Sequence, residues 1–441
     1  MTEMAFPVAG VPELEIEHDI IDPAALLAIR HAAMALLSEM KPDRGEEPAA
    51  LCEAVWPAYM IKDTKPHPRL VLVPLSRLGG SPGFSGSHVM IGYFIDGSAE
   101  SPIHPSRAMV LKIGRSATPD QDVLCIENSN ARLLRPFVGY HRESFAIPLW
   151  LHESHGFRLL WSPFASGEWT LQSVRGADST RLNLRVRDLW GLMGDLPVDS
   201  SNGDEVFTTI ERIYRLLTPL HRRGGTAKRE SRQLVQEYKW YLRDFDNSWG
   251  KDWAGVWAGE SEPNVVEFGT HYKNPLWVLD QLKSLGCGLY CGAIHGDLHP
   301  KNIVFSENSV PQSIDFGWTS NDSHIAKDFV LLECNLRFVL LRPDVSSLDL
   351  TAFTSWLKYD QSSPAFVNSH LSAMAKAITL LRREAQSMFP PDTDWNIEYI
   401  VPLFLVALGL LKHLKNYRNQ IAARLTVLEL ATLIAKEVLT R

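Results

Sequence analysis

The chain has 441 residues, of which 45% are hydrophobic, so it is long enough to bury a sizeable core in layers or in two lobes. Its 44 basic and 51 acidic side chains give a net charge of -7, which argues against bulk nucleic acid as the main partner. The five cysteines are few and odd in number, which favours a reducing, cytoplasmic compartment over a disulfide framework.

The N-terminal segment lacks the basic start and continuous apolar core of a secretory signal. Residues 1–65 contain one strong helical pattern, DPAALLAIRHAAMALLSEM, in which Asp22 is a plausible N-cap and Pro23 occupies the first helical position. We therefore expect a helical extension at 1–65, before the main fold.

From residue 69 onward the pattern changes to short apolar runs separated by turns. The runs are RLVLVPL, HVMIGYFID, AMVLKIG, SFAIPLWLH and FRLLWSPF. Because the turns between them are short, the strands should be largely antiparallel. The pattern predicts a β-rich lobe over residues 66–168.

The rest of the chain, 169–441, is predicted to be a mainly helical lobe. Helical patterns occur at 203–223, 228–245, 274–286 and 326–341, so a helical insertion is expected around 200–275. The most apolar segment, 399–411, is too short for a bilayer and is predicted to be a core helix. A β-rich lobe followed by a helical lobe is a bilobal α+β fold, whose cleft is the default ligand site.

Polar groups gather in the segment AIHGDLHPKNIVF (293–305), between two apolar ends. Asp297 and Asn302 lie five positions apart in a loop that leads into a strand, and Asp315 follows at the end of the next strand, in SIDFG. Two carboxylates and an amide oxygen form the hard-oxygen site that Mg²⁺ prefers. The spacing predicts that Asn302 and Asp315 hold the metal and that Asp297 accepts a proton from an attacking hydroxyl.

The small lobe offers complementary groups. Gly83 and Gly86 lie between two predicted strands, where glycine lets backbone N–H groups approach phosphate oxygens, although an ordinary turn is the alternative. Lys112 lies among apolar residues, where an ammonium needs a partner unless it reaches solvent at a strand edge. Glu127, in a helix-like segment, is either that partner or an ordinary exposed helix glutamate.

The two loops together resemble a known group of enzymes. HGDLHPKN followed by IDFG looks like the catalytic and metal-binding loops of the aminoglycoside phosphotransferase and choline kinase-like group, the small-molecule branch of the protein-kinase-like fold. The segments GFSGSHV, VLKIG and HIAKDFVLLE also resemble the ternary complex associated phosphotransferase-like domains of bacterial conflict systems. The likeness covers residues 70–340 and implies a bilobal fold that uses ATP and Mg²⁺.

The resemblance implies roles residue by residue. Asp297 becomes the catalytic base, Asn302 and Asp315 the metal ligands, and Lys112, paired with Glu127, the contact to the α/β-phosphates. Further positions follow by the same likeness: the phosphate loop at Gly83, Ser85 and Gly86, the adenine-contacting linker strand at Trp161, Ser162 and Phe164, and the loop-shaping residues His295, His299 and Asp328. The glycine loop departs from the G-x-G-x-x-G form of protein kinases.

The sequence therefore predicts an ATP- and Mg²⁺-dependent phosphotransferase that acts on a hydroxyl. Two alternatives remain, a nucleotide-binding switch that regulates a partner and an enzyme that transfers AMP. The complete set of Lys112, Asp297, Asn302 and Asp315 favours catalysis, because degenerate relatives usually lose at least one of these residues. A small-molecule acceptor is favoured over a protein acceptor, and neither a nucleic acid nor a membrane is expected.

An aromatic segment is the only candidate for recognition of the acceptor. YKWYLRDFDNSWGKDWAGVW (238–257) contains Trp240, Trp249, Trp253 and Trp257 among acidic residues, and could hold a cationic or ring-bearing substrate. Packing of an inserted helix pair against the large lobe is the favoured interpretation.

Overall fold

The structure is a computed structural model. It describes residues 2–4, 13–17, 23–25, 27–29, 31–32, 69–74, 88–95, 109–138, 145–165, 168–173, 180–185, 188–194, 200–221, 227–243, 245, 249–257, 261–305, 310–358, 366 and 368–440. The chain divides into two compact units, the first formed by Met1–Asp188 with Val304–Trp318 and the second by Leu189–Ile303 with Thr319–Arg441. Each unit is described by itself.

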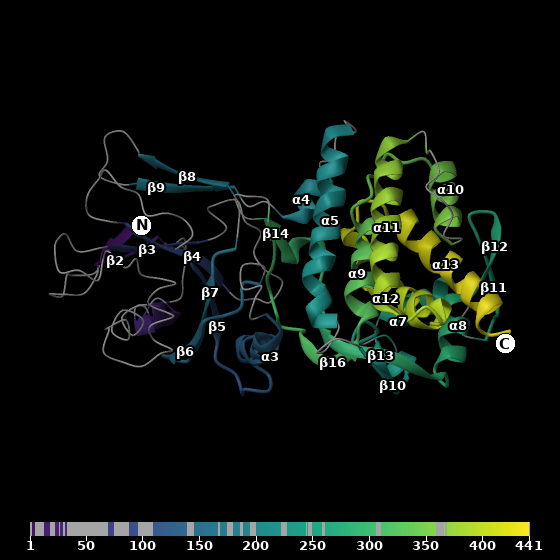
Figure 1. Cartoon of the computed structure of the whole chain (residues 1–441), viewed down its shortest axis with the longest axis horizontal. Helices are drawn as coiled ribbons and strands as arrows, with labels where there is room; N and C mark the ends of the chain where they lie inside the picture. The colour runs from purple at the N-terminus through teal and green to yellow at the C-terminus, as the bar shows by residue number, and fades with distance from the viewer. Residues whose placement is uncertain are drawn as a thin grey trace. The chain divides into compact units, whose positions relative to one another are not determined.

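The first unit is built on a seven-stranded sheet with the strand order β1-β2-β3-β4-β5-β7-β6 (Figure 1). Its strands are β1 (Thr2–Met4), β2 (Glu13–Glu17), β3 (Arg69–Pro74), β4 (His88–Ile95), β5 (Met109–Arg115), β6 (Trp150–Ser154) and β7 (Phe157–Pro163). Strands β2 and β3 are parallel, and the other neighbours are antiparallel. The hairpin β8 (Glu168–Ser173) and β9 (Thr180–Arg185) and the pair β14 (Ile303–Phe305) and β15 (Pro311–Ser313) lie outside this sheet.

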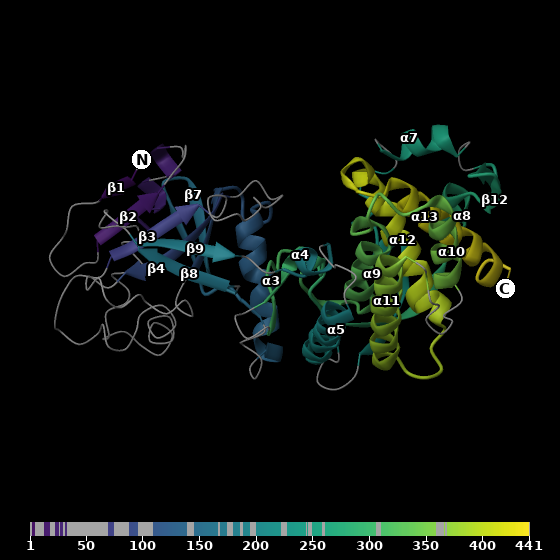
Figure 2. The same ribbon diagram turned by 90° about the horizontal axis from the view of Figure 1, so that it is seen from above.

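Helix α3 (Val123–Val138) lies between β5 and β6 in sequence and packs on β5, β6 and β7. Figure 2 shows this helix beside the sheet. Asp122 caps the start of α3, because it accepts hydrogen bonds from the backbone N–H groups of Leu124 and Cys125, both at 3.0 Å. Strand β5 alternates between buried and partly buried positions, with Met109, Leu111 and Ile113 in the core.

The second unit is mainly helical and contains a three-stranded sheet in the order β10-β13-β16. Its helices are α4 (Leu189–Gly194), α5 (Ser200–His221), α6 (Leu234–Glu237), α7 (Trp249–Val256), α8 (Pro275–Leu282), α9 (Ala326–Cys334), α10 (Ser347–Lys358), α11 (Ser369–Met388), α12 (Val401–Leu410) and α13 (Gln420–Glu437). Its strands are β10 (Lys228–Gln233), β11 (Asn264–Glu267), β12 (Thr270–Lys273), β13 (Gly286–Ile294) and β16 (Ser320–His324). Short segments of 3-10 or π-helix occur at η5 (Pro300–Asn302), η6 (Asn335–Val339), η7 (Asn396–Ile400) and η8 (Leu411–Asn416).

The α+β class expected from the sequence is confirmed, but three boundaries differ. The N-terminal segment is helical at 23–25, 27–29 and 31–32, yet it also adds β1 and β2 to the sheet. The alternation of ELEIE at 13–17 is the strand signal that the helical pattern after it obscured. The unit boundary falls after Asp188 rather than after 168, and 304–318 joins the β-rich unit.

The region 228–245, expected to be one helix, starts with a strand. Residues Lys228–Gln233 form β10 and pair antiparallel with β13 from Gly286 to Cys291, and only Leu234–Glu237 are helical. The polar sequence KRESRQ has weak strand propensity, so its backbone pairing with β13 decides its conformation. The expected insertion around 200–275 therefore contains β10, β11 and β12 as well as helices.

A buried ionic cluster joins four segments of the helical unit. The carboxylate of Glu333 on α9 accepts hydrogen bonds from Arg337 at 2.7 Å, from Arg382 on α11 at 2.9 and 3.0 Å, and from the hydroxyl of Tyr399 at 2.6 Å. All four side chains are buried. Burial alone would raise the pKa of Glu333, but the guanidinium groups of Arg382 and Arg337 lower it to about 2.

One segment of the described residues, Asn396–Asn416, is long and apolar enough to cross a membrane by length and composition. However, 72% of its most apolar window is buried inside the protein, and α12 packs against α9 and α13. This packing matches the core helix expected at 399–411.

Candidate active site

Lys112 of β5 and Glu127 of α3 form a bidentate ion pair in the first unit. The Nζ atom of Lys112 lies 2.7 Å from Oε1 and 2.9 Å from Oε2 of Glu127. Glu127 is only 3% exposed, so it is not an ordinary surface glutamate of a helix. The strand alternation puts Lys112 on the opposite side of β5 from the buried Leu111 and Ile113, which allows its amine to meet α3.

Asp315, at the end of the β15 segment, completes this cluster. Its Oδ1 atom lies 3.6 Å from the Nζ atom of Lys112, and its side chain is 43% exposed. Burial disfavours the charged amine of Lys112, but the carboxylates of Glu127 and Asp315 more than offset this and raise its pKa. The amine therefore stays protonated while one carboxylate remains open to solvent.

Helix α3 also holds the backbone of the IDFG loop. Asn130 donates a hydrogen bond to the carbonyl oxygen of Gly317 at 2.7 Å, and Glu127 accepts one from the backbone N–H of Phe316. Phe316 is completely buried, and Asp315 has a φ of 65°, in the left-handed region that non-glycine residues seldom adopt. Two hydrogen bonds from α3 thus fix the loop directly after Asp315, and this strained residue carries the exposed carboxylate.

Asp297 lies in the loop between β13 and η5 of the second unit. Asn302 donates from its Nδ2 atom to the backbone oxygen of Asp297 at 2.9 Å and lies 3.5 Å from its Oδ2 atom. The Nε2 atom of His299 is 3.8 Å from the same Oδ2, while its Nδ1 atom accepts from the backbone N–H of Lys301 at 3.2 Å. The side chain of Asp297 is 31% exposed, so a rigid loop presents a partly solvated carboxylate.

Asp328, fully buried in the first turn of α9, braces this loop. Its carboxylate accepts from the backbone N–H of His295 at 3.0 Å and of Gly296 at 2.8 Å. His221, at the end of α5, contacts the same carboxylate at 3.0 Å through Nε2. Burial would raise the pKa of Asp328, but these hydrogen bonds and nearby histidines lower it. Asp328 does not cap α9, whose N-cap position is Ile325.

The remaining predicted residues are placed as follows. His295 is fully buried, and its Nδ1 atom accepts from the backbone N–H of Asp297 at 3.3 Å, so it shapes the loop. Trp161 and Ser162 lie in β7, where the indole of Trp161 is enclosed in the core and only its backbone is left for an adenine contact; Phe164 follows the strand and is half-buried. The expected phosphate-loop residues Gly83, Ser85 and Gly86 lie outside the described residues.

Sequence reasoning missed Asn130 and His221. Asn130 sits on α3 one turn after Glu127, a spacing that could have suggested a common face. His221 ends α5 in LTPLHRR, which reads as an ordinary helix terminus with basic residues, and nothing local indicates the buried Asp328 opposite it.

The aromatic segment at 238–257 is largely packed inside the helical unit. Trp257 is 1% exposed and Trp253 is 9% exposed, and their ring centroids lie 4.5 Å apart. The Nε1 atom of Trp257 donates to Glu267 at 2.9 Å. The packing interpretation therefore holds for these two residues. Asp244 and Asp246 lie outside the described residues.

A second group of possible metal ligands occurs on the three-stranded sheet. Ligand atoms of Glu230, Cys291 and Asp322 lie within 4.8 Å of one another. The guanidinium of Arg232, however, bridges the two carboxylates at 2.6 and 2.9 Å. A protein cation already compensates this charge, and burial raises the pKa of the Cys291 thiol to about 12.

The comparisons with known proteins are consistent with the motifs. Residues 193–412 match the family model described as Ternary complex associated domain 9. A search of curated proteins finds no match to the chain.

Similar solved structures are kinases or phosphotransferases by name. A thermostable mutant of the aminoglycoside phosphotransferase APH(4)-Ia, in a ternary complex with ADP and hygromycin B, is 10% identical, with a TM-score of 0.41 over 82% of this chain and 97% of that chain. Macrolide 2'-phosphotransferase type I is 12% identical, with a TM-score of 0.35 over 80% and 93%. Choline kinase LicA from Streptococcus pneumoniae is 11% identical, with a TM-score of 0.31 over 75% and 92%.

Proposed function

We propose that the protein is a phosphotransferase that moves the γ-phosphoryl group of ATP to the hydroxyl of an acceptor, preferably a small molecule, in a Mg²⁺-dependent reaction. The observation that carries the proposal is the bidentate pair of Lys112 and Glu127, with Asp315 at 3.6 Å from the same amine. A strand lysine held by a helix glutamate beside a metal-binding aspartate is the arrangement that positions ATP phosphates in kinases.

Asp297 would act as the base in this reaction. The acceptor oxygen forms a bond to the γ-phosphorus, the bond from that phosphorus to the bridging oxygen of ADP breaks, and Asp297 takes the hydroxyl proton. Its partly exposed carboxylate is held by Asn302, while the backbone just before it is held by Asp328. A fixed but accessible carboxylate is what a general base requires.

The side chains proposed as metal ligands have the right chemistry for Mg²⁺. Asn302 uses its amide nitrogen to hold Asp297, which leaves the amide oxygen as its donor to a cation, and Asp315 supplies an exposed carboxylate. With ATP bound, the ion would neutralise charge on the phosphate oxygens. Asp315 already has Lys112 as a neighbour, so the chain and the ion would share the neutralisation of the triphosphate.

The direct test is incubation of the full chain with ATP labelled on the γ- or the α-phosphate, in Mg²⁺, with a metabolite pool. Transfer of the γ-label to a hydroxyl compound, found by mass spectrometry, is the expected result. Transfer of the α-label would show that AMP is moved instead. Tight nucleotide binding with no transfer to any acceptor, to protein or to water would replace the proposal with a nucleotide-binding switch.

We expect ATP affinity to rise with Mg²⁺ or Mn²⁺, because ligands from the chain and the triphosphate complete the metal shell. Asp315→Asn should remove most of this gain. Isothermal titration of ATP with and without the metal measures both values, and Asp280→Asn, on the exposed surface of α8, is the control. The same affinity in EDTA and in Mg²⁺ would count against the metal site.

Removal of the Lys112 amine is expected to weaken ATP binding by about tenfold or more, which is about 1.4 kcal/mol. Lys112→Met alone would also leave the buried Glu127 carboxylate without its partner and destabilise the fold. The double variant Lys112→Met, Glu127→Gln removes both charges, so it should keep more of the native melting temperature and still bind ATP weakly. A folded double variant with native ATP affinity would make this a structural ion pair.

A further inference from the structure

Tyr241, in the segment after α6, reaches the backbone of the loop that carries Asp297. Its hydroxyl donates a hydrogen bond to the carbonyl oxygen of Gly296 at 3.4 Å. Tyr241 is 9% exposed, and burial, together with the carboxylates of Asp297 and Asp328, raises its pKa. The hydroxyl therefore keeps its proton and acts as a donor to this carbonyl.

The contact falls on the peptide group that directly precedes the proposed base. The carbonyl of this group belongs to Gly296 and accepts from Tyr241. Its N–H belongs to Asp297 and donates to Nδ1 of His295 at 3.3 Å. Because a peptide group is planar, hydrogen bonds at its two ends fix the plane. The plane joins ψ of Gly296 to φ of Asp297, so fixing it restricts where the carboxylate of Asp297 lies.

Gly296 is the residue of this loop with the greatest backbone freedom. Its φ is 86°, in the region that glycine adopts without strain, and glycine also has many other conformations open to it. Asp328 of α9 holds the N–H of Gly296 at 2.8 Å, and Tyr241 holds its carbonyl. Two parts of the fold that are distant in sequence therefore hold the glycine in one conformation.

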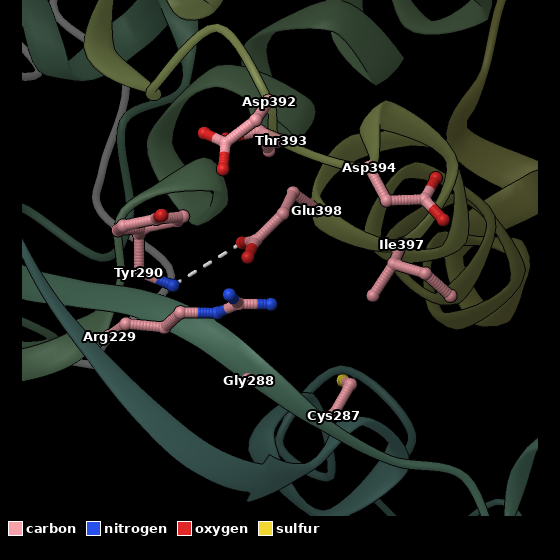
Figure 3. Close-up of a pocket in the computed structure, with 9 residues that line it drawn as sticks. All are labelled: Arg229, Cys287, Gly288, Tyr290, Asp392, Thr393, Asp394, Ile397 and Glu398. Carbon is pink, nitrogen blue, oxygen red and sulfur yellow. Dashed lines mark hydrogen bonds between the residues drawn. The ribbon is translucent and has the colours of Figure 1, made fainter.

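The ring of Tyr241 is itself held in place. It stacks on the ring of Tyr238, with the centroids 6.1 Å apart. The hydroxyl of Tyr238 contacts Nδ1 of His324 at 2.8 Å, and Nε2 of His324 contacts Glu398 at 2.7 Å. Glu398 also accepts from the backbone N–H of Tyr290 at 3.3 Å, a bond that Figure 3 shows in the wall of a pocket. Tyr238, His324 and Glu398 are buried, so this chain of contacts supports Tyr241 rigidly.

Helix α12 approaches the backbone of Tyr241 closely. A Cβ atom added at Gly409 would lie 2.5 Å from the carbonyl oxygen of Tyr241 and 2.8 Å from its Cβ atom. Real Cβ atoms do not make such short contacts, so glycine at 409 allows Tyr241 to come this near to the core helix. The segment after α6 is therefore anchored on α12.

We propose that Tyr241 is a positioning residue for the proposed base: its hydroxyl fixes the peptide between Gly296 and Asp297 and thereby the Asp297 carboxylate. The inference rests on the proposed function and deepens it, because Tyr241 acts through Asp297 and not on ATP or the metal.

The test is a double-mutant cycle in the full chain, with turnover measured by hydrolysis of ATP or with an acceptor. Tyr241→Phe removes only the hydroxyl and should lower kcat by about two- to tenfold, the range that one neutral hydrogen bond supplies, while KM for ATP stays unchanged. In the Asp297→Asn background the same change should have no further effect, because the group through which Tyr241 acts is gone. A merely structural tyrosine would give the same loss in both backgrounds.

Tyr417→Phe is the matched control. The hydroxyl of Tyr417 also donates to a backbone carbonyl, that of Leu410 at 2.7 Å, and neither residue belongs to the loop. This variant should keep the native kcat. Hydrogen exchange followed by mass spectrometry gives a readout independent of activity: the amides of residues 295–299 should exchange faster in Tyr241→Phe than in the native chain and in Tyr417→Phe.

A native kcat in Tyr241→Phe, equal losses in both backgrounds, or unchanged exchange of the loop would overturn the inference. A native chain that neither hydrolyses ATP nor transfers phosphate would instead overturn the proposed function. In that case the exchange measurement still decides whether Tyr241 holds the loop.

Discussion

Asp297→Asn is expected to lower turnover by about 10²–10⁴-fold, the usual contribution of a positioned base. The amide has nearly the same shape but no comparable proton affinity, so it cannot take the proton of the acceptor hydroxyl. The hydrogen bond from Asn302 ends on the backbone oxygen of residue 297, which the substitution keeps. The melting temperature and the metal-dependent ATP affinity should therefore stay close to the native values.

Turnover is measured with the acceptor once it is known, and by ATP hydrolysis until then. His299→Gln is measured in parallel, because His299 lies 3.8 Å from the Asp297 carboxylate. We expect His299 to assist this carboxylate and not to act as the base in its place. Asp280→Asn on α8 controls for the loss of a surface carboxylate. A native rate in Asp297→Asn would remove the base assignment and favour the nucleotide-binding switch.

Glu333→Gln is expected to destabilise the protein by about 3–5 kcal/mol, the usual effect of breaking a buried ion pair from one side. Arg337 and Arg382 are 2% and 3% exposed, so their guanidinium groups would remain buried without a countercharge. The cluster joins α9, which carries the brace Asp328, to η6, α11 and η7. Urea unfolding followed by circular dichroism measures the loss.

Glu211→Gln is the matched control, since Glu211 pairs with Arg215 at 2.9 Å on an exposed face of α5 and should contribute less than about 1 kcal/mol. The pH dependence gives an independent check. The pKa of Glu333 falls from 4.5 to about 2 in the folded state, so its contribution is complete above about pH 4.5 and is lost as the pH falls toward 2. In Glu333→Gln, the free energy of unfolding should therefore fall less steeply over this acidic pH range than in the native protein. The same fall in both proteins would show that other carboxylates dominate acid unfolding.

The loops were readable from the sequence because their chemistry is local. Asp297 and Asn302 are five positions apart in one loop, and the hydrogen bond between them needs only that loop to form. Asp315 was readable for the same reason, as a carboxylate at a short strand end. The φ of 65° at Asp315 could not be predicted from the sequence, because the packing of Phe316 and the hydrogen bonds from α3 to this loop determine it.

By itself, the sequence determined the α+β class and predicted the residue types of a phosphotransferase site, because alternation, helical periodicity and short polar motifs are properties of neighbouring residues. Only the tertiary structure decided that KRESRQ is a strand, because its pairing partner lies some sixty residues later in β13. It also decided that Glu127 is buried against Lys112, that Asp328 braces the backbone of His295 from 33 positions away, and that His221 contacts Asp328 from 107 positions away. These contacts join segments distant in sequence, and their energy depends on burial and on the charge of the partner, which no local pattern contains.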